Sequence, residues 1–411
     1  MWVTRYVATS TKVRLPFRVL ALDGGGLRGI LPATTLAAIE ALTGRPIATQ
    51  FDLIVGTSTG GILSLALAVT NSGVPAYSAE DLRQLYFENA ATIFPLGGMP
   101  LVHNSGLLGT RTQLPPNATL GERIKHFMGY ENIEKVVAPV GGSRRSLYSP
   151  DGLERVLNSY FGEARLGDAV TQVAVTSYDY QARRTVLFRN YSTDDSNQPP
   201  PSAHALMREV ARATSAGPTF FPPASVEGFP GVFVDGGVTA NNPSMIAYVE
   251  AQQIINGLEV FAGEYAKAYR KVHPDDTKEY PRDLPVDIFL VSIGTGVAPL
   301  ASDDVTVQLV ERENWLALAH DHLMGALFTG LTELHNEQLN QLLNVVVRGE
   351  SSRYFRIQTP LQEANFAMDD ARPENLEALA RDAQRMVEEH ADDMQAIARQ
   401  LLAYQELYES V

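Results

Sequence analysis

The sequence has no cysteine among its 411 residues. Disulfides, cysteine nucleophiles and thiolate metal sites are therefore excluded, and the absence fits a reducing compartment. Basic charge is also scarce, since 33 Lys and Arg stand against 47 Asp and Glu, a formal net charge of −14. Nucleic-acid binding needs a basic surface, so no nucleic acid polymer is expected as a partner. Electrostatics alone would not hold the protein on an anionic membrane.

Long hydrophobic runs are missing as well. The longest, at 62–69, is far shorter than the roughly 20 residues that span a bilayer. Residues 1–14 lack an apolar stretch followed by a small-residue cleavage site, so they do not resemble a signal peptide. We therefore expect a cytoplasmic protein whose contact with a membrane surface is transient and mainly apolar.

Short apolar segments alternate with helical patterns along the chain. Residues 18–22 and 52–55 are apolar runs, and each is followed by glycines and a helical pattern, at 30–42 and 60–69. This repeat of strand, tight turn and helix predicts an α/β fold with a mostly parallel central sheet. Further strands are expected at 172–177, 185–189, 232–234 and 286–292. Further helices are expected at 79–94, 150–161, 203–214 and 243–255.

Two segments depart from this alternation. Residues 94–146 are rich in Gly and Pro and show no steady hydrophobic period, which favours a lid or cap over a site. A poorly ordered surface insertion is the alternative. Residues 374–402 place apolar side chains at helical spacing, which predicts one or two amphipathic helices packed on the core.

A glycine-rich loop follows the first expected strand. Its residues are Gly24, Gly25, Gly26, Leu27, Arg28 and Gly29. They fit G-x-G-x-x-G between a strand and a helix, which is the setting of a dinucleotide-binding turn. That turn requires an acidic residue at the end of the second strand, whereas Asp52 begins this strand and Gly56 ends it. The other interpretations are a backbone N–H site for an oxyanion and a plain strand–helix turn.

A second turn carries a serine. Its residues Gly56, Thr57, Ser58, Thr59 and Gly60 fit G-x-S-x-G, with an apolar strand before and an apolar helix after. This is the setting of a nucleophile elbow, in which a strained turn lifts the serine hydroxyl above the sheet. Side chains at Gly56 and Gly60 would clash with neighbouring elements, and the Thr59 N–H is a natural oxyanion donor. A glycine-rich turn with an idle serine is the simpler alternative.

A serine nucleophile needs a base, and none of the eight histidines lies in a recognisable catalytic motif. The candidates for a triad are His320, His322 and His335. One carboxylate stands out, because Asp235 ends a short apolar strand and is followed by Gly236 and Gly237. Acids at the carboxyl ends of strands in open α/β sheets point into the functional crevice, and burial raises their pKa. A turn-forming Asp-Gly pair is the alternative.

Together these segments resemble the patatin-like phospholipases. The similar segments, in chain order, are 23–29, 56–61, 213–223, 235–237, 241–243 and 292–296. The resemblance implies a three-layer α/β/α fold, with a catalytic core at 17–248 and a part at 249–411 that completes the sheet and adds helices. It implies a lipid acyl hydrolase that acts on phospholipids, lysophospholipids or galactolipids without metal or cofactor.

The resemblance also assigns roles to individual residues. It implies a Ser-Asp dyad in place of a triad, with Asp235 accepting the proton of Ser58. The implied oxyanion hole consists of backbone N–H groups of the glycine loop, chiefly Gly25 and Gly26, with Thr59. Some bacterial members are held inactive until a small nucleotide or a protein partner binds. Basic residues within 94–146 are compatible with such an activator, among them Arg111, Arg123, Lys125, Arg144 and Arg145.

Overall fold

The computed structural model describes residues 16–95, 146–193, 198–256, 288–298, 322–344 and 352–409. The predicted lid at 94–146, with the basic residues named above, lies almost entirely outside these ranges. His320 lies outside them too, and the side chain of His322 is not described. Within these ranges no helix combines the length and the apolar character needed to cross a membrane.

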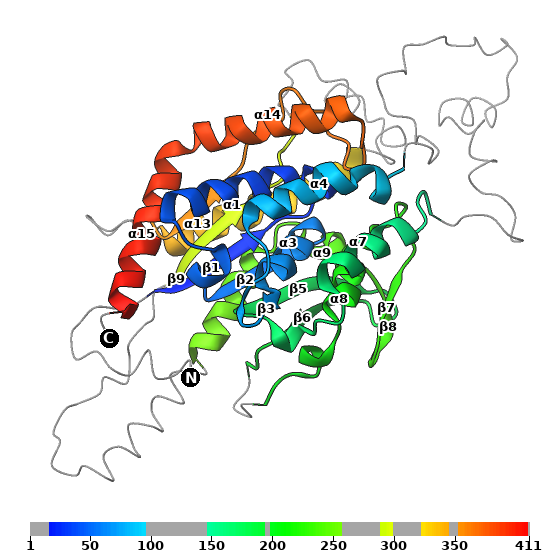
Figure 1. The fold of residues 1–411 in the computed structure, drawn as a ribbon, viewed down its shortest axis with the longest axis horizontal. Coiled ribbons are helices and arrows are strands. Elements are labelled where there is room, and N and C mark those ends of the chain that lie inside the picture. The colour runs from blue at the N-terminus through cyan, green and yellow to red at the C-terminus, as the bar shows by residue number, and fades with distance from the viewer. Residues whose placement is uncertain are drawn as a thin grey trace, which may run out of the picture.

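In the described part of the chain, eight strands form one mixed sheet in the order β10-β9-β1-β2-β5-β8-β7, with β6 paired to β5 (Figure 1). The parallel strands are β1 (Phe17–Leu22), β2 (Leu53–Thr57), β5 (Gln172–Asp179), β9 (Ile288–Ile293) and β10 (Tyr354–Ile357). The antiparallel strands are β6 (Arg184–Arg189), β7 (Ala224–Val226) and β8 (Phe229–Asp235). A separate small hairpin joins β3 (Thr70–Asn71) to β4 (Val74–Pro75). The expected mostly parallel sheet is confirmed, and β7 and β10 are additions to the predicted strands.

Helices cover both faces of this sheet, as expected for three layers. One face carries α1 (Ile30–Thr43), α3 (Thr59–Ala68), α4 (Ala79–Ile93), α7 (Asp151–Phe161), α8 (Met207–Thr214), α14 (Pro373–Glu389) and α15 (Ala391–Glu409). Of these, α1 lies between α4 and α14 (Figure 1). The other face carries the helical residues 244–256 and α13 (His322–Leu343). Short helical turns are α2 (Ile47–Gln50), η2 (Gly26–Gly29), η3 (Leu166–Asp168), η4 (Pro201–His204) and α9 (Gly237–Ala240).

The two faces are built by the alternation of side chains along the strands. In β1, Leu20 and Leu22 belong to the core under α1, whereas Val19 and Ala21 belong to the core under residues 244–256. All six residues of β1 are buried, which is why residues 19–22 form a continuous apolar run rather than an alternating one; the buried Arg18 is paired with Asp52. Because β9 pairs with β1 along its whole length, residues beyond 249 complete the sheet, while the domain boundary at 248 stays a prediction.

Candidate active site

Ser58 occupies a strained turn between β2 and α3. Its backbone φ of 55° and ψ of −122° lie in a region that L-residues rarely adopt. The turn is possible only with glycines around it: a Cβ at Gly56 would stand 2.1 Å from the carbonyl oxygen of Gly60, and a Cβ at Gly60 would stand 2.2 Å from that of Leu22. The predicted steric need for both glycines is therefore confirmed. The Ser58 N–H donates to Thr214 Oγ1 at 2.8 Å.

Asp235 reaches this turn through the topology of the sheet. β6 pairs along one edge of β5, so β2 and β8 share the other edge. On that edge β2 pairs with β5 as far as Thr176, and β8 pairs with β5 from Ser177 onward. The two strands are antiparallel to each other and meet with their carboxyl ends together. Ser58 follows the end of β2 and Asp235 ends β8, so this head-to-head meeting brings the two side chains into contact.

The contact is a short hydrogen bond. Ser58 Oγ donates to Asp235 Oδ2 at 2.6 Å, and the Gly237 N–H donates to Asp235 Oδ1 at 2.7 Å. Burial raises the pKa of the Asp235 carboxyl to about 6, while the hydrogen bonds from Ser58 and Gly237 act in the opposite direction. A carboxylate with such a pKa accepts a proton more readily than an ordinary one and is still ionised at neutral pH.

The glycine loop lies against this pair, since a Cβ at Gly24 would stand 3.2 Å from Ser58 Cβ. Several of its N–H groups are already engaged: Gly24 donates to Asn241 O at 3.0 Å, Leu27 to Met368 O at 2.8 Å and Arg28 to Gly25 O at 3.2 Å. Between the described residues, no hydrogen bond is found for the N–H groups of Gly25, Gly26 and Thr59. These three are the donors that a substrate oxygen could use.

The structure does not favour the dinucleotide interpretation of this loop. The close approach that glycine permits is used by the protein itself, because a Cβ at Gly26 would stand 2.2 Å from Met368 O and one at Gly25 would stand 2.3 Å from Thr295 Oγ1. Asp52, at the amino end of β2, forms a buried ion pair with Arg18, with Nη2 and Oδ1 2.9 Å apart. Asp52 therefore lies at the amino ends of the strands, whereas the glycine loop lies at their carboxyl ends.

The triad interpretation gains no support from the described histidines. His335 Nδ1 lies 3.3 Å from Asn242 O. No described histidine forms a hydrogen bond with Ser58 or Asp235. The described residues also hold no group of three His, Asp or Glu side chains placed to bind a metal ion.

Residues from the end of the chain complete the surroundings of the loop. Arg356 of β10 pairs with Asp23, with its Nη1 2.9 Å from Oδ1 and its Nη2 2.5 Å from Oδ2. The Arg28 guanidinium lies 4.1 Å from the ring centre of Phe366. Sequence reasoning missed these contacts, and it also missed Thr214 and Thr295, although both lie in segments that it singled out.

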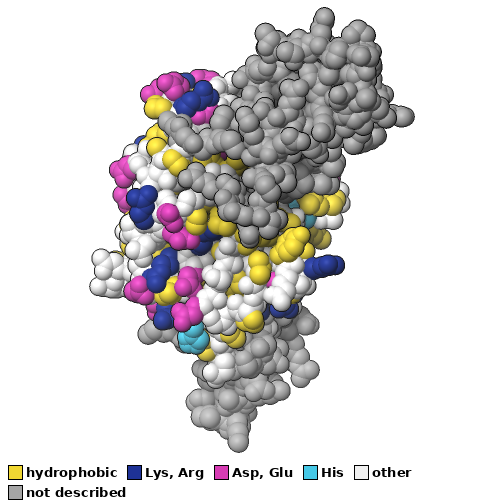
Figure 2. Space-filling view, turned by 90° about the vertical axis from the view of Figure 1, so that its right-hand side faces the viewer, with side chains coloured by type: hydrophobic (Ala, Val, Ile, Leu, Met, Phe, Trp, Pro, Cys, Tyr) yellow, Lys and Arg dark blue, Asp and Glu magenta, His cyan; other side chains and the backbone are white. Residues whose placement is uncertain are grey.

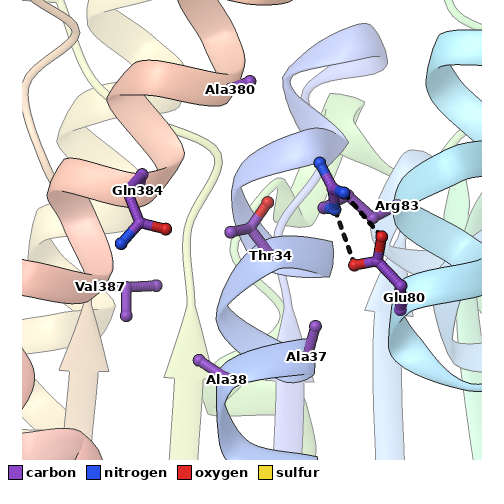
Figure 3. Close-up of a pocket in the computed structure, with 8 residues that line it drawn as sticks. All are labelled: Thr34, Ala37, Ala38, Glu80, Arg83, Ala380, Gln384 and Val387. Atoms are coloured by element: carbon purple, nitrogen blue, oxygen red, sulfur yellow. Dashed lines mark hydrogen bonds and ion pairs between the residues drawn. The ribbon is translucent and has the colours of Figure 1, made fainter. Parts of the chain in front are cut away.

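A hollow elsewhere on the surface is separate from this site (Figure 3). Its floor is on α1 and its walls are on α4 and α14. Within α4, Arg83 and Glu80 form an ion pair at 2.6 Å. The lining residues are Thr34, Ala37, Ala38, Glu80, Arg83, Ala380, Gln384 and Val387. None of them belongs to the glycine loop, the serine turn or β8.

A serine on a strained strand–helix turn above a sheet is the nucleophile elbow of serine hydrolases, and here its hydroxyl donates directly to an acid rather than to a histidine. The family model described as "Patatin-like phospholipase" matches residues 20–248, more than half of the chain. The chain therefore belongs to the patatin-like phospholipase family, which makes it a lipid hydrolase by family.

Individual relatives agree with this assignment. "Patatin-like protein 2" of Arabidopsis thaliana is 26% identical over 383 residues, which cover 88% of this chain and 81% of the relative. "Patatin-17" of Solanum cardiophyllum is 26% identical over 382 residues, with the same coverage. A "cGAMP-activated phospholipase" of Pseudomonas aeruginosa is 31% identical over 241 residues, 58% of each chain. The solved structure of VipD from Legionella pneumophila aligns at 12% identity over 95% of this chain and 73% of its own, with a TM-score of only 0.32.

Proposed function

We propose that this protein is a lipid acyl hydrolase that releases fatty acids from membrane phospholipids or related lipid esters, with Ser58 as nucleophile and Asp235 as base. The observation that carries the proposal is the 2.6 Å hydrogen bond from Ser58 Oγ to Asp235 Oδ2. A serine hydroxyl becomes an effective nucleophile when an adjacent base takes its proton.

In the proposed reaction Asp235 accepts the Ser58 proton while Oγ attacks the ester carbonyl carbon. The N–H groups of Gly25, Gly26 and Thr59 stabilise the oxyanion, and the N-terminus of α3 favours the developing negative charge. Asp235 then gives the proton to the leaving alcohol, which leaves an acyl-enzyme on Ser58. A water molecule, deprotonated by Asp235, attacks the acyl carbon, the bond to Ser58 Oγ breaks, and Oγ takes the proton back from Asp235 as the fatty acid leaves. The scheme uses no metal and no cofactor.

Contact with a lipid surface would be transient and apolar. Figure 2 views the molecule from the side where α4 ends and where α7 and β8 lie, and hydrophobic side chains gather across its middle. Phe366, which stacks on Arg28 beside the glycine loop, is 43% exposed, and Val238, three residues after Asp235, is 36% exposed. With a net charge of −14, such side chains rather than basic ones would supply the attraction.

The test is lipid mass spectrometry after incubating total membrane lipids with wild type and with Ser58→Ala. We expect free fatty acids and lysolipids with wild type only, and the lipid classes that disappear will identify the preferred headgroup. Equal release by both proteins would overturn the assignment of Ser58. No release by either, in the presence or absence of a cyclic dinucleotide, would overturn the proposed activity.

The pH dependence of the reaction follows from the pKa of Asp235. A base must be ionised to accept a proton, so activity is expected to be full about one pH unit or more above 6, half-maximal near pH 6, and lower still at more acidic pH. The measurement is kcat/KM for a soluble short-chain ester between pH 4.5 and about 8.5, which reports the pKa in the free enzyme. A plateau that extends down to about pH 5, as an ordinary carboxyl with a pKa of about 4 would give, would contradict this assignment.

A regulated form of the same activity is the alternative that one relative favours. The Pseudomonas aeruginosa protein named as a cGAMP-activated phospholipase is 31% identical over its matched part. If this chain is switched in a similar way, purified protein would be silent until a cyclic dinucleotide is added. Full activity of the purified protein without a nucleotide would count against this alternative.

A further inference from the structure

Thr295 lies beside the glycine loop because of the register of β9 on β1. Leu22 is the partner of Ile293, so the residues that follow the two strands remain neighbours. Thr295 is 2% exposed, and its Oγ1 donates to the carbonyl oxygen of Gly24 at 2.7 Å. This threonine lies beyond the matched family range of 20–248, and the dyad mechanism gives it no role.

The hydrogen bond from Thr295 determines which way the next N–H group points. In a trans peptide the C=O and the following N–H are antiparallel within one plane, and no cis peptide bond occurs among the described residues. Thr295 holds the Gly24 carbonyl on its own side, so the Gly25 N–H points to the opposite side of the loop. That N–H is one of the three that donate to no other described residue.

The next peptide group is held in the same manner from within the loop. The Gly25 carbonyl accepts from the N–H and the Nε of Arg28, at 3.2 and 3.3 Å. It therefore directs the Gly26 N–H away from Arg28. The two donors needed for an oxyanion are thus oriented by two different side chains, one local and one from the carboxyl end of β9.

Glycine makes this external support necessary. Three consecutive glycines leave the backbone many accessible φ and ψ values, so Gly24, Gly25 and Gly26 cannot orient their own peptide planes. The Asn241 amide is a weaker second donor to the Gly24 carbonyl, at 3.4 Å. Its Oδ1 would stand 2.5 Å from a Cβ at Gly24, so it limits the space on that side of the loop.

We propose that Thr295 is a positioning residue, whose hydroxyl fixes the Gly24–Gly25 peptide so that the Gly25 N–H faces the oxyanion formed at Ser58. Thr295 touches neither substrate nor dyad and acts only through the peptide group. The proposal rests on the proposed acyl hydrolase function. Its effect is confined to the transition state, because the oxyanion exists only there and in the tetrahedral intermediates.

The test replaces Thr295 by Val and by Ser. Val keeps the shape and removes the donor, so kcat is expected to fall about 10- to 100-fold with KM nearly unchanged, less than the 10²–10³ typical for complete loss of an oxyanion donor. Ser keeps the hydroxyl and should restore kcat to within about threefold of wild type, a limit below the loss expected for Val. A trifluoromethyl ketone, which forms a tetrahedral oxyanion with Ser58, should bind Thr295→Val more weakly by the same factor as kcat/KM.

Thr171→Val is the matched control for a lost buried hydroxyl. Thr171 is 3% exposed and its Oγ1 donates to Phe51 O at 2.8 Å, near the amino ends of β2 and β5. Thr171→Val should lose stability without losing kcat.

The proposal would be overturned if Thr295→Val had the same kcat as Thr171→Val, or if Thr295→Ser lost as much kcat as Thr295→Val. If Thr295→Val does not fold, the test rests on the folded Thr295→Ser variant. A large loss of kcat in Thr295→Ser contradicts the proposal that Thr295 positions the glycine loop. Wild type that is no more active than Ser58→Ala refutes the proposed function instead.

Discussion

Asp235→Asn is expected to lower kcat by about 10³- to 10⁴-fold, because the general base proposed to activate Ser58 is lost. The asparagine can keep the local geometry: its Oδ1 can accept from the Gly237 N–H, and its amide can donate to Ser58 Oγ, reversing that hydrogen bond. The turn and the glycine loop should remain in place while proton transfer stops.

The same substitution is expected to stabilise the fold. Burial raises the Asp235 pKa from 3.8 to about 6, so the ionised carboxylate is less favourable in the folded than in the unfolded chain. A shift of roughly 2 units corresponds to about 3 kcal/mol. This cost is absent below pH 3.8, grows between 3.8 and about 6, and is complete above 6. Asp235→Asn should therefore be more stable than wild type at pH 8, with the difference shrinking as the pH falls.

Initial rates at about pH 8 measure the loss of kcat. Urea denaturation at about pH 8 and at about pH 4.5, on either side of the Asp235 pKa, measures the change in stability. Asp179→Asn is the control, because Asp179 is a buried acid at the end of the neighbouring strand β5 whose Oδ1 accepts from the Gln181 and Ala182 N–H groups. It should keep activity. A stability gain for Asp235→Asn that is equal at both pH values would contradict the raised pKa, and retained activity would rule out Asp235 as the base.

Gly60→Ala is expected to damage stability and activity together. The added Cβ would stand 2.2 Å from Leu22 O and 2.7 Å from Asp23 O, which are backbone atoms at the end of β1. Backbone cannot rotate out of the way as a side chain can, so α3 must move away from β1. We expect a loss of about 3 kcal/mol or more. The movement separates Thr59 from the glycine loop, and a kcat loss of at least about 100-fold should follow because the oxyanion donors no longer converge.

The control is Gly330→Ala in α13, where a new Cβ meets no atom within 4 Å. Alanine favours a helix over glycine by up to about 1 kcal/mol, so this variant should be neutral or slightly stabilised and fully active. Urea midpoints and initial rates compare the two. Wild-type stability and activity in Gly60→Ala would show that α3 does not pack on β1 as closely as the structure indicates.

The parts of the fold that follow from local pattern could be predicted. The strand, turn and helix around Ser58 depend on neighbours in sequence, and so do the glycines at positions 56 and 60 with their steric role. Asp235 was predicted to face the site because it ends a strand. The structure reaches that result differently, since β8 is antiparallel and meets β2 end to end along β5. Strand direction depends on tertiary pairing, which no local pattern contains.

The support of the glycine loop could not be predicted for a related reason. Met368 contributes only its backbone carbonyl, so its residue type carries no signal. Arg356 belongs to the four-residue strand β10, too short for a clear period. Thr295 belongs to a recognised segment, yet only the register of β9 on β1 shows which carbonyl its hydroxyl meets.

The late position of these supports in the chain has a consequence for biosynthesis. Ser58 and Asp235 emerge from the ribosome well before Thr295, Arg356 and Met368. A nascent chain would thus carry both dyad residues while its glycine loop still lacks the donors and acceptors that hold it. For a protein proposed to degrade membrane lipids, this order of synthesis means that the glycine loop gains its contact with Met368 only after both Ser58 and Asp235 have been made.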